Sequence, residues 1–209
     1  MSGILDLLNG PEGKSLIDGV GGQLGLNKKT ATTALASAIP LILGAMRNNA
    51  STQDGTSGIL GALGNKHSGG ILDNLGSILG GSNIDEDVMK DGGGILGHVF
   101  GGQENNAAHA IGKSNGIDMR AAMDIMKVAA PVVMGYLGKK AMSNNVSDQN
   151  GLNGLLGGIL GDDNDKQQEM ASKIQDFNNN DLSVDDLAGL ISEGGKSGGI
   201  LGALGKMFG

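Results

Sequence analysis

Histidine is the residue type in this chain best suited to acid–base or metal chemistry, and the sequence contains three: His67, His98 and His109. A helical metal site usually places two ligands four positions apart, and no pair of these histidines has that spacing. We expect His98 and His109 on neighbouring helices, where their rings could meet and act as a general base or hold a metal. The reading we favour is that all three are partly exposed polar side chains.

A short acidic run superficially resembles a calcium loop. It consists of Asp162, Asp163 and Asp165. An EF-hand loop needs glycine at its sixth position and glutamate at its twelfth, and counted from Asp163 these positions hold Gln168 and Ile174. We therefore interpret the acids as helix-capping residues rather than as ligands.

Residues 10–15, GPEGKS, end like a phosphate-binding loop, but their two glycines are three positions apart where such a loop needs five. The chain has no cysteine, and no serine lies in a G-x-S-x-G sequence. The sequence thus assigns no catalytic, cofactor-binding or metal-ligating residue. We expect a protein that is not an enzyme and that uses no cofactor.

The composition narrows the class of partner. A formal net charge of -7 and a pI near 4.8 argue against nucleic-acid binding, which depends on clustered lysine and arginine. The first ten residues lack the basic segment and long apolar run of an export signal, and the least charged run, residues 30–46, is rich in threonine, serine and alanine. We expect a soluble, cytoplasmic protein.

The elements that would position any site come from an internal repeat. Shifting the sequence by 91 positions lays residues 25–46 on residues 116–137 without a gap, and Pro40 falls on Pro131. In both copies apolar residues recur every three or four positions, which predicts a helix with one buried face. The prolines lie inside that face, so we predict a kink or break at residues 36–40 and at residues 127–131.

Helical periodicity extends through the whole chain, and no strand pattern competes with it. Pro11 suits the first position of a helix, and Asn27 and Asp85 are good N-caps. The fold class is therefore all-α, with two similar three-helix lobes and short glycine-rich helices between and after them. The predicted parts are a first repeat at 1–50, a glycine-rich linker at 51–91, a second repeat at 92–142, and short C-terminal helices with a glycine-rich tail at 143–209.

The triplet Gly-Ile-Leu recurs along the chain, and the sequence GILGALG occurs twice, at residues 58–64 and 199–205. Helices with glycines three or four positions apart, such as the pairs Gly154 and Gly158 or Gly157 and Gly161, offer flat faces for another helix. These faces either pack inside the molecule, which we favour, or receive a partner. Residues 198–209, GGILGALGKMFG, also resemble a membrane-surface peptide.

Two segments carry a family resemblance: residues 92–118, GGGILGHVFGGQENNAAHAIGKSNGID, and the helix through VAAPVVMGYLGKK to Lys140. They resemble a bacterial family known as YidB-like, or domain of unknown function 937, over most of residues 3–140. The resemblance implies a small, helical, glycine-rich protein without established catalytic residues. The first copy departs from the pattern where Leu7, Asn9 and Asp18 stand in place of His98, Phe100 and His109.

The function expected from these features is association with a protein partner or with a second copy of the chain. Small-residue helix faces favour it, since leftover apolar surface marks an interaction site. The alternative is a peripheral membrane or lipid-binding protein that uses the C-terminal apolar segment.

Overall fold

The computed structural model describes residues 4–80 and 85–160, and these contain helices and no strand, which confirms the all-α class. The described helices are α1 (Ile4–Asn9), α2 (Pro11–Leu24), α3 (Lys28–Asn49), α4 (Gln53–Asn65), α5 (Gly70–Asp73), α6 (Leu75–Leu79), α7 (Glu86–Phe100), α8 (Glu104–Asn115), α9 (Met119–Ser143) and α10 (Gln149–Leu160).

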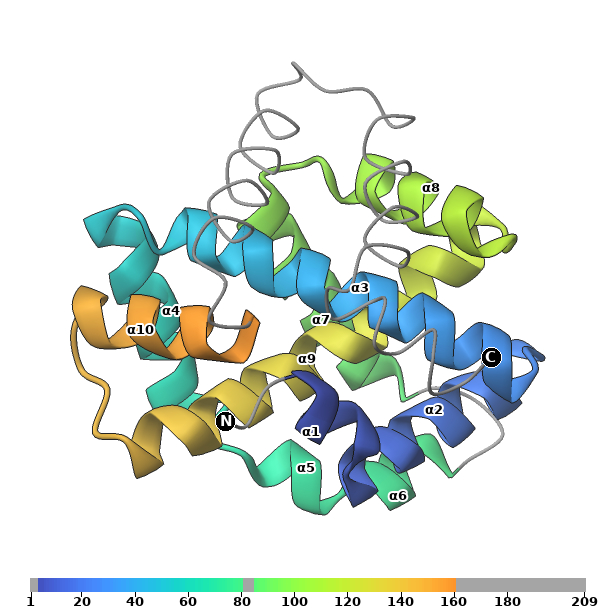
Figure 1. Ribbon diagram of the computed structural model, residues 1–209, viewed down its shortest axis with the longest axis horizontal. Helices are drawn as coiled ribbons and strands as arrows, with labels where there is room; N and C mark the ends of the chain where they lie inside the picture. Colours follow the sequence, from blue (N-terminus) through green and yellow to red (C-terminus); the bar gives the residue numbers. More distant parts are fainter. Residues whose placement is uncertain (1–3, 81–84, 161–209) are drawn as a thin grey trace.

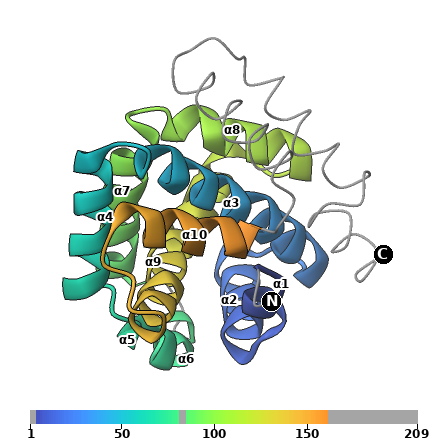
Figure 2. The same ribbon diagram turned by 60° about the vertical axis from the view of Figure 1, so that its left-hand side comes forward.

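The two longest helices, α3 and α9, lie side by side at the centre, and the shorter helices surround them (Figure 1). Helices α4 and α10 cover one end of this pair, while α1 and α2 lie toward the other, as a second view confirms (Figure 2). By length and composition α3 and α9 could each cross a membrane, but most of their residues are buried inside the protein. This burial is the ordinary property of core helices.

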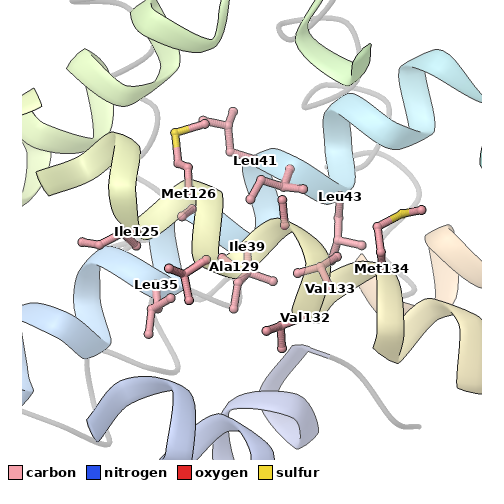
Figure 3. Close-up of a cluster of buried hydrophobic side chains, with 14 of the residues drawn as sticks. Leu35, Ile39, Leu41, Leu43, Ile125, Met126, Ala129, Val132, Val133 and Met134 are labelled. Carbon is pink, nitrogen blue, oxygen red and sulfur yellow. The ribbon is translucent and has the colours of Figure 1, made fainter. Parts of the chain in front are cut away.

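The core between α3 and α9 is built from aliphatic and methionine side chains. It includes Leu35 and Ile39 of α3 and Ile125, Met126 and Ala129 of α9, all at 0% exposure (Figure 3). The apolar stripe predicted for each helix is buried, but the expectation of a single buried face is wrong, because residues 34–46 of α3 and 128–135 of α9 are buried on every side. Buried residues from both predicted repeats and from the linker belong to one hydrophobic cluster.

The starts of α3 and α9 have matching local geometry. Asn27 accepts a hydrogen bond from the Thr30 amide at 2.9 Å, and Asp118 accepts one from the Ala121 amide at the same distance. Each carboxamide or carboxylate oxygen thereby satisfies a free amide of the first helical turn. The preceding helices both end on a left-handed glycine. These correspondences support the internal duplication, which stays a prediction.

Neither helix breaks at its proline, so of the kink or break that we expected, the break is wrong and the kink stays a prediction. Helix α3 runs through Pro40 and α9 through Pro131 without interruption. A proline inside a helix costs about 3 kcal/mol because it removes one hydrogen bond. Both prolines and the residues that flank them are buried, and this packing on either side offsets the cost.

In α9, helix α7 packs closely at the carbonyl group that Pro131 leaves without its helical hydrogen bond. Pro131 cannot bond to the carbonyl oxygen of Lys127, and Gly92 of α7 lies so close to this oxygen that a Cβ would overlap it. Only a glycine Cα–H can pack there, and such contacts recur where helices touch. The close packing of α7 on α9 therefore depends on Gly92.

Helix α7 begins earlier than the second repeat. Asp85 accepts hydrogen bonds from the amides of Asp87 and Val88, which confirms it as an N-cap, and the helix then continues to Phe100. The predicted boundary between linker and second repeat, at residues 91 and 92, thus falls inside a helix. Pro11 is also confirmed at the start of α2.

The Gly-Ile-Leu triplets of α4, α5, α7 and α10 share one arrangement. In each triplet one apolar residue enters the core: Ile59, Leu72, Leu96 and Ile159. The four glycines, at 58, 70, 94 and 158, face solvent. The triplets therefore dock their helices through the aliphatic side chains and turn the glycines outward.

Candidate functional site: the α4–α7 groove

An open groove of about 860 Å³ lies between α4 and α7, and we call it the α4–α7 groove. Its wall residues include Gly58 and Ala62 of α4 and Gly94 of α7, whose small side chains leave the space between the helices unfilled. A Cβ added at Gly94 would meet no atom within 4 Å. The groove is thus a consequence of the small residues on the facing sides of α4 and α7.

Buried apolar side chains from three helices line the inside of the groove. They are Ile59 of α4, Val88 and Val99 of α7 and Met134 of α9, each at 9% exposure or less. Exposed charged residues of both signs, Asp87 and Lys90 among them, stand at its edge. An apolar lining with a polar rim is the usual composition of a protein-binding surface.

One end of the groove is closed by charged contacts around Asp91 of α7. Its carboxylate forms an ion pair with the Lys66 ammonium group at 2.5 Å, and its second oxygen lies 3.7 Å from His67 Nε2. Both partners come from the segment that ends α4. Asp91 therefore links α7 to α4 at this end.

His67 is the most buried of the three histidines, with 6% of its surface exposed, so the expectation that all three are partly exposed is wrong for His67. Its backbone amide donates to the Ala62 carbonyl at 3.0 Å, and its own carbonyl oxygen lies where a Cβ at Gly138 of α9 would overlap it. Burial lowers the pKa of His67, Asp91 opposes this effect, and Lys66 adds to it. The net result is a histidine that favours its neutral form.

The other two histidines occupy different surroundings. His98 of α7 is exposed and lines the groove, where its Nε2 would lie 3.4 Å from a Cβ at Gly58. His109 is exposed on α8 and does not line the groove. Within residues 4–80 and 85–160 no three histidine, aspartate or glutamate side chains are grouped to hold a metal.

His67 has the perturbed pKa expected of a functional group, but it is buried, lies outside the groove lining and faces Asp91. Its contacts are those of a residue that holds α4, α7 and α9 together. The groove itself offers apolar surface and small residues, which are the features that accept another helix.

Sequence reasoning singled out His98 and His109 and missed the cluster of Lys66, His67 and Asp91. No local pattern marks this cluster, because Lys66 and His67 follow α4, Asp91 lies in α7, and the three side chains meet only in the folded protein. The acids at 162–165 and the tail at 198–209 lie outside the described residues.

The fold and the groove define a glycine-rich helical protein with one shared core. A family model described as bacterial protein of unknown function, DUF937, matches residues 6–140. The chain therefore belongs to this family, and the YidB-like resemblance is confirmed. No curated protein and no solved structure matches the chain.

Proposed function

We propose that this protein is a non-enzymatic binding protein that takes a helical segment of a protein partner into the α4–α7 groove. The observation that carries the proposal is the groove, with its buried apolar lining, its small-residue walls and its charged edge. We further propose that the protein works in the cytoplasm and does not bind nucleic acid, in keeping with its charge of -7.

Surface exposure elsewhere supports this choice of site. Among the described residues the large apolar side chains that stay exposed are Met119 and Met142, one near each end of α9. Two single methionines are normal for a protein surface and do not make a patch. In the groove, by contrast, apolar side chains from α4, α7 and α9 converge on a common space.

The shape of the groove favours a helix as its occupant. Gly58 and Ala62 lie on the same side of α4, four residues apart, which is one helical turn. Small residues at this spacing allow a second helix to approach closely, as they do wherever helices pack at short distance. A partner helix with apolar residues at positions i and i+4 would place both in the lining.

A photo-activated cross-linker tests the proposal in bacterial cells that make the protein. The reactive amino acid replaces Lys90, an exposed residue at the groove edge, and in a matched control it replaces Asn105, an exposed residue of α8 outside the groove. We expect position 90 to trap a helical protein segment with apolar residues one turn apart. Products that are the same from both positions, or none from position 90, would contradict the proposal.

A further inference from the structure

We propose that the C-terminal segment of the chain, residues 199–208, binds the α4–α7 groove of its own molecule and competes there with the partner. The inference rests on the proposed function of the groove. It adds a named ligand, which is part of the chain itself, and a means of regulating access.

The first argument is that the sequence of this segment already docks elsewhere in the protein. Residues 199–205 read GILGALG, letter for letter the sequence of residues 58–64 in α4. In α4 the first isoleucine and the second leucine, Ile59 and Leu63, are buried at 3% and 2% exposure, four residues apart. The glycines at 58, 61 and 64 are exposed. This seven-residue sequence therefore presents an apolar pair on one side when it is helical.

In the C-terminal copy the corresponding pair is Ile200 and Leu204, and Phe208 follows at the same interval. Three apolar residues at intervals of four match one helical stripe. The described part of the chain shows a further case of this kind of docking. Helix α10 buries Leu152, Leu156 and Ile159 against α3, α4 and α9.

The second argument is chemical fit between the segment and the groove. The lining would receive the aliphatic stripe, and glycines on both sides permit close approach of the two helices. Lys206 comes two residues after Leu204, and Asp87 stands exposed at the groove edge. A contact between Lys206 and Asp87 would be a rim ion pair, which sets orientation more than affinity.

The third argument is reach. The last described helix, α10, contacts α4, which forms one wall of the groove. Residues 161–198 connect this helix to the segment, and a chain of that length would reach about 57 Å even if it were wholly helical, at about 1.5 Å per residue. Because the segment is tethered to the groove, binding within one chain is favoured over binding to a second copy at low protein concentration.

The chain has no cysteine, which makes site-directed cross-linking of the full-length protein clean. One variant carries Lys90→Cys and Ala203→Cys, and the matched control carries Ser77→Cys and Ala203→Cys. Ser77 is an exposed residue of α6 outside the groove lining. A short bismaleimide reagent then joins cysteines that come close, and the intact mass separates links within one chain from links between two.

We expect the Lys90→Cys variant to form the intrachain link at least tenfold faster than the control. Adding Leu204→Asp, which replaces an apolar residue of the proposed contact with a charged one, should bring the rate down to that of the control. Equal rates in the two cysteine pairs, an unchanged rate with Leu204→Asp, or links only between chains would each overturn the inference. None of these three results would affect a partner captured in the photo-cross-linking experiment. Each of the two proposals can therefore fail without the other.

Discussion

At the scale of single residues, Asp91 and His67 connect three helices. The Asp91 carboxylate contacts both Lys66 and His67, and the His67 backbone rests on Gly138 of α9. Because His67 is buried, adding a proton to its ring places a charge where water cannot reach it well. The residue therefore couples the stability of this end of the groove to pH.

The sign of this coupling follows from the lowered pKa of His67. The folded protein holds the imidazole neutral at pH values where the unfolded chain, with a pKa of about 6.5, already binds a proton. The stabilisation is complete above about pH 6.5 and is lost as the pH falls from there through the folded-state value. We predict that urea unfolding of the wild type shows a lower free energy at pH 5.5 than at pH 7.5.

The variant His67→Gln should lose part of this pH dependence, since glutamine does not titrate. His109→Gln is the matched control, because it removes a histidine that is exposed on α8. A wild-type pH dependence in His67→Gln would show that the effect belongs to other groups.

At the scale of helices, glycines have two opposite uses. Gly92 lies against the Lys127 carbonyl oxygen of α9, whereas Gly94, two positions along the same helix, has open space around it. A glycine in a helix interior costs up to about 1 kcal/mol relative to alanine. The protein carries this cost at Gly92, where α7 packs closely on α9, and at Gly94, which lies in the wall of the groove.

Alanine scanning of these two glycines should give opposite results. We predict that Gly92→Ala lowers the free energy of unfolding by about 1–3 kcal/mol, because its Cβ forces α7 and α9 apart. Gly94→Ala should raise it by up to about 1 kcal/mol through helix propensity alone. Chemical denaturation followed by circular dichroism measures both, and a loss of stability in both variants would contradict the packing described here.

The elements themselves were largely predictable from the sequence, because local rules set them. Asn27 and Pro11 mark helix starts through their own chemistry, and the stripe of α3 follows from periodicity. The uninterrupted helix at Pro40 and Pro131 was not predictable, since it depends on burial by neighbouring helices. The groove was equally unpredictable from the sequence, because glycine spacing alone does not say which glycines pack against a neighbouring helix and which face open space.

At the scale of the whole molecule, both predicted repeats contribute to one core. Leu35 of α3 and Met126 of α9, which are 91 positions apart, are both fully buried in one hydrophobic cluster, and the two helices pack against each other. Because each helix forms part of the other's packing surface, we expect neither half of the described chain to hold its core without the other.

Truncating either side chain should therefore lower the free energy of one shared unfolding transition. We predict that Leu35→Ala and Met126→Ala each reduce the free energy of unfolding by about 2–5 kcal/mol. The helical circular dichroism signal should still fall in a single step. Asn105→Ala, at an exposed position on α8, serves as the control and should change little. Two separate transitions in either core variant would show that the halves unfold independently.

The central claim is that this protein acts through the α4–α7 groove, and a pair of groove-filling variants tests it most directly. Gly94→Gln projects a side chain from the groove wall, while Gly61→Gln places the same side chain on α4 outside the groove; both glycines are exposed with free space around them. Partner capture by the cross-linker at position 90 is then measured in each. The account predicts that Gly94→Gln reduces capture at least tenfold and Gly61→Gln leaves it unchanged. Equal capture in the two variants would contradict it.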